Sequence, residues 1–167
     1  MKPVYLALGS NLGNREEYLW AGVRGLAARG VNIVRCASIY STEPREVLHQ
    51  PWFLNTVLEA SIELDADQLL SVCLEVEKEN HRIRDSVKGP RTLDVDIIFY
   101  GNRIIRKPDL EIPHPRFSSR RFVLFPMAEI GPEFTDPVSG KTVRQLLEEC
   151  TDKSDVRVFR GRWGNAG

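Results

Sequence analysis

The stretch from Gly89 to Tyr100 constrains the fold of this chain more than any other part of the sequence. Gly89-Pro90 is typical of a loop. The residues after it are rich in β-branched and aromatic types and end at Gly101-Asn102, which predicts a strand. Because side chains alternate along a strand, four of them should share a buried face: Leu93, Val95, Ile97 and Phe99. The opposite face should then carry Asp94, Asp96, Ile98 and Tyr100.

Two aspartates on one strand face are unusual, because Asp is a poor strand former. Residues i and i+2 on a strand lie about 7 Å apart, so both carboxylates can hold a common object. They raise each other's pKa unless a cation lies between them. The preceding loop carries four basic residues: Arg82, Arg84, Lys88 and Arg91. Mg²⁺ is typically held by one or two carboxylates together with substrate phosphates, and Arg suits phosphate recognition. The alternative is a solvated sheet face that happens to carry two aspartates.

The composition indicates one soluble globular domain. The chain has 167 residues, of which 42% are hydrophobic and 28% charged, enough to bury a core. We expect a single domain over residues 1–160 and a flexible tail over 161–167. Lys+Arg and Asp+Glu number 23 each, so the zero net charge gives no support to nucleic acid or membrane as a main partner.

Cysteine usage and the N-terminus indicate a reducing compartment. The three cysteines are far apart and form no Cys-x-x-Cys spacing, which favours neither zinc nor a disulfide framework. The sequence shows no signal-peptide core and no stretch long enough to span a membrane. We therefore expect a cytoplasmic protein.

The order of predicted elements indicates an α+β fold. The sequence predicts strands over residues 4–8, within 31–41 and over 52–64, and helices over 14–30 and from Asp65, where Gln68 completes a capping box. The glycine-rich segment 9–13 could bind an anion before the following helix, although a tight turn explains its glycines more simply. Gly101-Asn102 is interpreted as a hairpin turn returning through residues 103–105. Strand–helix–strand–strand–helix–strand predicts a ferredoxin-like βαββαβ antiparallel sheet with helices. C-terminal decorations follow: a helix over 120–130 interrupted by Pro126, and a short helix after Thr142.

The third predicted strand carries a second candidate site. Leu54, Leu58, Ala60 and Ile62 should share one face, and Phe53, Asn55 and Val57 the other. Asn is depleted in strands, and its amide offers two donors and an acceptor. Asn55 could therefore read the edge of a heterocycle stacked on Phe53. The alternative is an Asn that satisfies a neighbouring backbone group.

Six short motifs in this order resemble one known family. They are Ala7-Leu8-Gly9-Ser10-Asn11-Leu12-Gly13, Phe53-Leu54-Asn55, Arg82-Ile83-Arg84, Gly89-Pro90-Arg91-Thr92-Leu93-Asp94-Val95-Asp96, Pro113-His114 and Arg120-Arg121-Phe122-Val123-Leu124. The chain thereby resembles the 6-hydroxymethyl-7,8-dihydropterin pyrophosphokinase family of folate biosynthesis. The fourth motif is highly specific, and the others are individually weak.

The resemblance implies a reaction and a set of site residues. It implies transfer of pyrophosphate from ATP to the pterin hydroxymethyl oxygen, releasing AMP, with two Mg²⁺ ions on Asp94 and Asp96. It assigns Arg82 and Arg91, together with these aspartates, to catalysis. The pterin site would comprise Thr42, Pro44, Phe53, Asn55 and Phe122, and the nucleotide site Glu77, Arg84, His114 and Arg120. Segments 45–50 and 82–91 would close over the substrates, and we expect a monomer. From the residues alone, His114 could equally be a structural histidine between two prolines.

Two rival functions share the same order of elements. An RNA-recognition module would carry a Lys/Arg-Gly-Phe/Tyr aromatic signature on its third strand and a basic surface, and this chain has neither. A small-molecule-sensing regulatory domain would have no need for paired carboxylates beside four basic residues. Mg²⁺-dependent conversion of ATP to AMP in the presence of a pterin separates all three functions.

Overall fold

The computed structural model describes residues 2–43, 51–80 and 92–161. The strands are β1 (Lys2–Ser10), β2 (Asn32–Cys36), β3 (Ile39–Thr42), β4 (Phe53–Ile62), β5 (Asp94–Tyr100), β6 (Ile105–Lys107), β7 (Leu110–Ile112) and β8 (Val156–Arg160). The helices are α1 (Arg15–Ala27), α2 (Ala66–Glu79), α3 (Arg121–Ile130) and α4 (Val143–Glu149), with a 3₁₀ turn over Phe117–Ser119.

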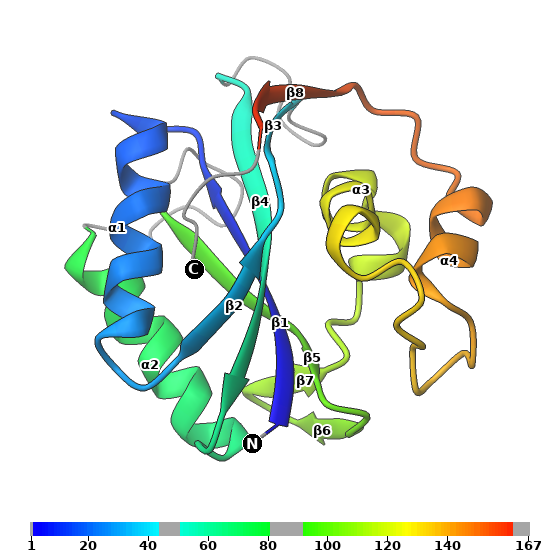
Figure 1. Ribbon diagram of the computed structural model, residues 1–167, viewed down its shortest axis with the longest axis horizontal. Coiled ribbons are helices and arrows are strands. Elements are labelled where there is room, and N and C mark those ends of the chain that lie inside the picture. The colour runs from blue at the N-terminus through cyan, green and yellow to red at the C-terminus, as the bar shows by residue number, and fades with distance from the viewer. Residues whose placement is uncertain (1, 44–50, 81–91, 162–167) are drawn as a thin grey trace.

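An antiparallel sheet forms the centre of the molecule. Its strand order is β5-β1-β4-β3-β8, and β2 pairs with β4 beside β3. Helices α1 and α2 cover one face of this sheet, and α3 and α4 lie on the other (Figure 1). The chain is therefore a mixed α and β structure with helices on both faces of an antiparallel sheet.

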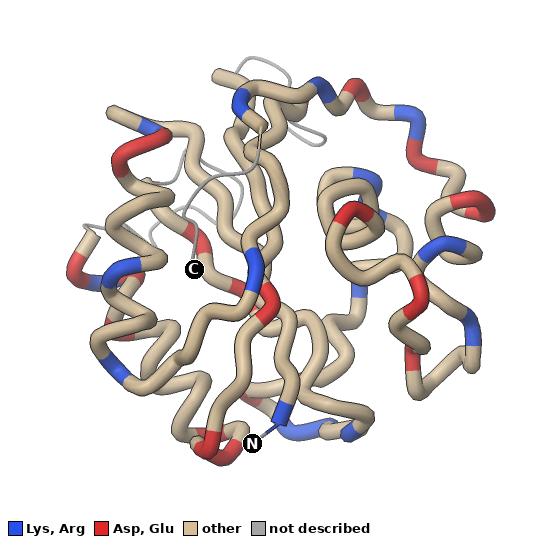
Figure 2. The backbone as a smooth tube through the Cα atoms, viewed as in Figure 1, with Lys and Arg blue, Asp and Glu red and all other residues tan. Residues whose placement is uncertain are grey.

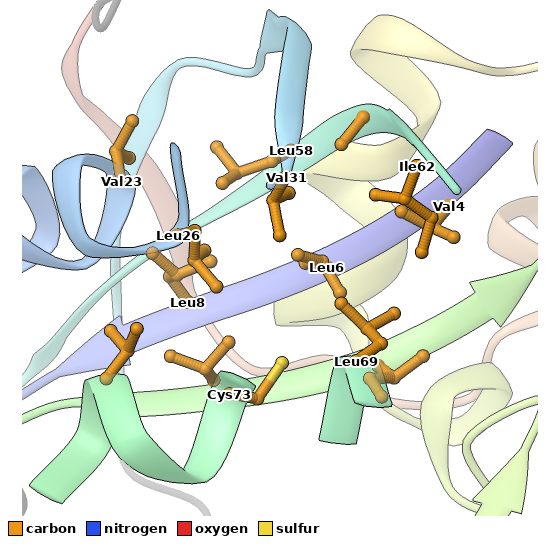
Figure 3. Close-up of a cluster of buried hydrophobic side chains, with 14 of the residues drawn as sticks. Val4, Leu6, Leu8, Val23, Leu26, Val31, Leu58, Ile62, Leu69 and Cys73 are labelled. Atoms are coloured by element: carbon orange, nitrogen blue, oxygen red, sulfur yellow. The ribbon is translucent and has the colours of Figure 1, made fainter. Parts of the chain in front are cut away.

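Two apolar clusters hold these layers together. The first lies between the sheet and the α1–α2 layer, where Leu6 and Leu8 of β1 meet Leu26 of α1 and Leu69 and Cys73 of α2 (Figure 3). The second joins the opposite face to α3 and α4 through Tyr5, Val57, Phe99, Met127 and Leu146. The predicted apolar faces of α1, α2 and β4 are confirmed, as are the capping boxes that begin α2 and α4.

The predicted alternation along β5 fails near its end. The pairing of β1 with β5 shifts register between Tyr5, opposite Phe99, and Leu6, opposite Ile97. Ile98 is the extra residue of this β-bulge, and a bulge re-aims the side chains that follow it. Phe99 therefore packs on the α3 side and Tyr100 in the α1–α2 cluster, the reverse of the prediction. Asp94 and Asp96 precede the bulge and keep their common face.

The single strand predicted within residues 31–41 is divided into β2 and β3. Ser38 lies between them, and its backbone N–H donates to Glu129 Oε1 at 2.9 Å instead of to a neighbouring strand. The hydroxyls of Ser38 and Tyr40 donate to the same carboxylate at 2.9 and 2.7 Å. A long-range contact from α3 thus interrupts the strand and ties α3 to β3.

Three further features of the structure differ from what the sequence predicted. The turn at Gly101 does not make a hairpin with β5, because Gly101 N donates to Pro3 O at 2.7 Å while β6 pairs with β7. Helix α3 continues through Pro126, since its buried residues pack against the sheet and the proline removes only one backbone donor. The C-terminal strand β8, which pairs with β3, was not predicted.

Charges of both signs are interspersed over the described residues (Figure 2). Most of the ion pairs lie on the surface, such as Arg24–Glu17 and Lys107–Asp67, where each contributes little to stability. In the part of the chain that the structure describes, every helix is too short or too polar to cross a membrane.

Candidate active site

The register of three neighbouring strands places Asp94 and Asn55 on one face of the sheet. Gly9 of β1 pairs with Asp94 of β5 on one side and with Asn55 of β4 on the other. Residues paired across strands point to the same face, and two strand spacings separate the two positions by about 10 Å. Val57, two residues after Asn55, packs in the cluster beneath α3. Carboxylates and an amide therefore lie at the two ends of one surface that faces the α3 side.

Asn55 is held in place by a specific partner. The residue is 7% exposed, and its side-chain Nδ2 donates to Thr42 Oγ1 at 2.6 Å. Phe53, two residues earlier on the same strand face, is partly buried. In the register of β3 and β4, Thr42 pairs with Phe53 and Tyr40 with Asn55. The role of Thr42, Phe53 and Asn55 in pterin binding stays a prediction. The Thr42 bond uses one of the two amide N–H groups, so the amide has further capacity to read a ligand edge.

Gly9 has a role that the sequence interpretation missed. It lies inside β1, which runs to Ser10, and not in a turn. A Cβ at Gly9 would lie 2.5 Å from Asn55 Oδ1 and 3.5 Å from Phe53 Cδ1. Glycine within a strand commonly marks such a close approach, and that rule was the available signal. Gly9 lets the Asn55 amide and the Phe53 ring lie directly over the sheet.

Asp94 and Asp96 are partly buried at the start of β5. Mg²⁺ prefers oxygen ligands and is commonly bound by one or two carboxylates plus substrate phosphates, with water completing the shell. Among the described residues, no three His, Cys, Asp or Glu side chains gather into a metal cage. A closed four-ligand zinc site is therefore absent from this part of the chain. Two carboxylates on one rigid strand fit a magnesium ion that is shared with phosphates.

Glu77 of α2 reaches the backbone of the same strand. It is 2% exposed, and Oε2 accepts a hydrogen bond from Val95 N at 2.8 Å. Val95 lies between the two aspartates, so Glu77 fixes the backbone that carries them. Burial raises the pKa of the Cys73 thiol, and the negative charges of Glu77 and Asp96 raise it further. The role of Glu77 toward the nucleotide stays a prediction.

His114 lies beside β5, and its hydrogen bonds and surroundings define the protonation state of its ring. Its backbone N donates to Ile98 O at 3.1 Å, and its Nδ1 accepts from Arg116 N at 3.1 Å. Burial, and then the charges of Arg120 and Arg116, lower the pKa of His114 to about 4. The imidazole is therefore neutral at pH 7, and with Nδ1 acting as acceptor its proton lies on Nε2. A neutral ring with one N–H suits hydrogen bonding to a phosphate oxygen.

This pKa predicts a pH dependence of folding. A pKa of about 4 in the folded chain and about 6.5 in the unfolded one means that the unfolded state binds an extra proton between these values. The stabilisation is present above pH 6.5 and is lost as the pH falls to about 4, by about 3 kcal/mol. Urea unfolding of wild type and His114→Gln at several pH values measures the difference. A constant difference in unfolding free energy from pH 7 to pH 4 would contradict it.

The start of α3 carries two of the predicted site residues, Arg120 and Phe122. Arg120 is the N-cap residue, and its guanidinium lies 5.6 Å from the centre of the Phe122 ring. The first backbone N–H of the helix, that of Arg121, donates to Asp152 Oδ2 at 2.9 Å. Asp152 was not singled out from the sequence, because 31 positions separate it from its partner. The one local indication of a structural role for Asp152 was its Asp-x-Ser spacing to Ser154, whose N–H and hydroxyl donate to Asp152 Oδ1.

The remaining predicted site residues lie outside the described residues: Pro44, Arg82, Arg84 and Arg91. Their roles stay predictions.

Comparison with known proteins settles the family. A sequence model of the family described as 7,8-dihydro-6-hydroxymethylpterin-pyrophosphokinase (HPPK) matches residues 5–132. This chain belongs to that family. The matched range includes every predicted site residue that the structure describes, and it ends before Asp152 and β8.

Individual pyrophosphokinase relatives agree with this assignment. The chain is 40% identical over 149 residues to the "2-amino-4-hydroxy-6-hydroxymethyldihydropteridine pyrophosphokinase" of Synechocystis sp., covering 87% of this chain and 76% of that protein. It is 37% identical to the "Folic acid synthesis protein fol1" of Pneumocystis carinii, covering 89% of this chain but 20% of that protein.

A solved structure shows the same fold. The crystal structure of Plasmodium falciparum HPPK-DHPS wild type with pteroate superposes with a TM-score of 0.71 at 14% identity. The superposition covers 89% of this chain and 42% of the Plasmodium chain. The chain thus spans less than half of the Plasmodium and Pneumocystis proteins, although it matches most of the Synechocystis one.

Proposed function

We propose that this chain transfers pyrophosphate from ATP to the hydroxymethyl group of 6-hydroxymethyl-7,8-dihydropterin, releasing AMP, in folate biosynthesis. Membership of the pyrophosphokinase family supports this reaction. The observation that carries it is the shared sheet face of Asn55 and Asp94, one strand to either side of Gly9. That face offers a heterocycle site at one end and a phosphate site at the other.

The pterin end of the site fixes the acceptor. Asn55 hydrogen bonds the edge of the ring, and Phe53 and Phe122 contact its faces. Thr42 orients the Asn55 amide, and Pro44 is a further proposed pterin-binding residue. A pterin held in this way presents its hydroxymethyl oxygen toward β5. Holding the two reactants in line removes much of the entropic barrier to transfer.

The phosphate end of the site neutralises charge. Asp94 and Asp96 hold two Mg²⁺ ions, which supply charge neutralisation to the phosphates when bound. His114 donates Nε2–H to a phosphate oxygen, while Arg84 and Arg120 bind phosphate as cations. Arg82 and Arg91 stabilise charge that develops in the transition state. Pyrophosphoryl transfer needs mainly position and charge, so no general base is assigned.

Five finer assignments belong to the same proposal. The strand order β5-β1-β4-β3, with α1 and α2 on one face, supports a ferredoxin-like βαββαβ core. We further propose one domain over residues 1–160 with a tail over 161–167, a monomeric state and a cytoplasmic location. The substrates are the two small molecules, without nucleic acid or membrane as a partner.

The test is turnover with defined substrates. The purified chain is incubated with ATP, 6-hydroxymethyl-7,8-dihydropterin and Mg²⁺, and AMP and pterin pyrophosphate are separated by chromatography. We expect equal amounts of the two products, and none after chelation of the metal. AMP formation that does not depend on the pterin, or ADP as the product, would overturn the proposal. Pterin binding without turnover would favour the small-molecule sensor instead.

A further inference from the structure

The segment Asp152–Val156, here called the C-terminal strap, joins the two sides of the proposed pterin site. It leads from α4 to β8 and lies outside the range that the family model matches. Figure 1 shows this part of the chain crossing from the α3–α4 side of the molecule to the edge of β3. Its two ends make hydrogen bonds to two different elements of the site.

The first end of the strap is attached to the start of α3. Asp152 is 8% exposed, and its side-chain Oδ2 accepts a hydrogen bond from Arg121 N at 2.9 Å. Its other oxygen, Oδ1, accepts from Ser154 N and from the Ser154 hydroxyl at 2.9 and 2.6 Å. A carboxylate that accepts from the first N–H of a helix also complements the helix dipole. Asp152 thereby fixes the turn of α3 that carries Arg120 and Phe122.

The second end of the strap is attached to the end of β3. Val156 pairs with Thr42 in the antiparallel register of β3 and β8. Just beyond, Asp155 N donates to Glu43 Oε1 at 2.7 Å, and Glu43 N donates to Asp155 O at 3.3 Å. Thr42 in turn holds the Asn55 amide. The strap is therefore hydrogen-bonded on one side to the helix that carries Phe122 and on the other to Glu43, the residue that follows Thr42.

Helix α3 is also hydrogen-bonded to the β3 region at its other end, so the strap acts on the start of the helix alone. Glu129, near the C-terminal end of α3, accepts three hydrogen bonds from Ser38 and Tyr40. Apolar packing through Val123, Leu124, Met127 and Ile130 holds α3 against the sheet, and the two polar attachments lie at its two ends. If the strap is released, Glu129 still holds the far end of α3 while its first turn can move relative to the sheet.

We infer that Asp152 is a positioning residue for pterin binding, because it fixes the separation between Phe122 on α3 and the Thr42–Asn55 pair on the sheet. This inference rests on the proposed pterin site. A flat heterocycle contacts both sides only if that separation is constant. Arg120, a proposed phosphate-binding residue, lies at the same turn, but Asp94 and Asp96 lie on β5 and do not move with α3. Nucleotide binding should therefore depend less on Asp152 than pterin binding does.

The experiment compares Asp152→Ala with Asp136→Ala in the full chain. Asp136 is a matched control: it is 4% exposed and also accepts hydrogen bonds from two backbone N–H groups and a serine hydroxyl, within the turn before α4. Thermal melting measures the loss of stability in both variants. Dissociation constants are measured for the pterin and, separately, for a non-hydrolysable ATP analogue.

We expect Asp152→Ala to raise the pterin dissociation constant about tenfold, and that of the ATP analogue much less. Asp136→Ala should change neither constant, although its melting temperature falls. The inference is overturned if Asp152→Ala and Asp136→Ala bind the pterin with equal affinity. It is also overturned if Asp152→Ala loses affinity for the pterin and for the ATP analogue to the same extent. Ser154→Ala removes one hydrogen bond to Asp152 and gives a milder test, with a smaller but selective rise expected, should Asp152→Ala fail to fold. In that case, a pterin dissociation constant that is unchanged in Ser154→Ala overturns the inference.

This result is distinguishable from a failure of the proposed function. Wild-type turnover of ATP and pterin to AMP tests the function alone. A wild type that turns over normally, beside an Asp152→Ala variant with normal pterin affinity, rejects the strap's role and leaves the function standing.

Discussion

Replacing either Asp94 or Asp96 by asparagine is expected to reduce pyrophosphoryl transfer by about a hundredfold to a thousandfold while the chain stays folded. Asparagine keeps the shape of the side chain and removes its charge. Both residues are partly buried at the start of β5, a strand that pairs along its length with β1. A rigid strand positions metal ligands better than a loop does, so no neighbouring residue can easily take over.

The measurement is initial rate against Mg²⁺ concentration for wild type, Asp94→Asn and Asp96→Asn, with a melting curve for each. Asp109→Asn, in the exposed turn between β6 and β7, serves as the control for loss of one negative charge. We expect both site variants to need more Mg²⁺ and to bind ATP more weakly. Two folded variants with near-normal rates and an unchanged Mg²⁺ dependence would falsify the metal assignment.

Replacing Asn55 by alanine is expected to weaken pterin binding by about tenfold to a hundredfold, and binding of an ATP analogue far less. The reason is that the buried amide, held by Thr42, reads the edge of the heterocycle, and nothing in alanine replaces its hydrogen bonds. Thr42→Val keeps the shape of residue 42 but removes the acceptor that orients the amide. It should produce a smaller loss in the same direction.

The control is Asn32→Ala, since Asn32 is also a strand asparagine but is exposed on β2, where it donates to the Ser61 hydroxyl. Calorimetric titration of each variant with the pterin and with the ATP analogue measures the selectivity. Equal losses for both ligands in Asn55→Ala would assign the residue to general stability of the sheet and not to pterin recognition.

Local chemistry in the sequence was enough to predict most of the central sheet and its helices. The faces of β4 followed from simple alternation, and the starts of α2 and α4 followed from capping residues three positions apart. The common face of Asp94 and Asp96 also followed from alternation, because both residues precede the bulge at Ile98.

The predictions that failed depend on contacts between distant residues. Ser38 interrupts a strand because Glu129, 91 positions away, takes its N–H. The pairing of β8 with β3 joins segments more than 110 positions apart, as the Glu43–Asp155 contact shows. Alternation could not reveal the Ile98 bulge, since an extra residue in one strand is defined only by its partner. The roles of Gly9 and Asp152 were missed for the same reason.

The buried contact between Glu77 and Val95 N also bears on how this protein behaves in solution. Of the described strands in the main sheet, β2, β5 and β8 each pair with one neighbour and lie at its edges. An edge strand with unpaired N–H and C=O groups is a template for strand addition by another chain. Along β5, the Glu77 carboxylate occupies the outward N–H of Val95, and His114 N occupies the outward carbonyl of Ile98. The strand that carries the aspartates is thereby protected against intermolecular β-pairing, so loss of the Glu77 carboxylate should favour aggregation.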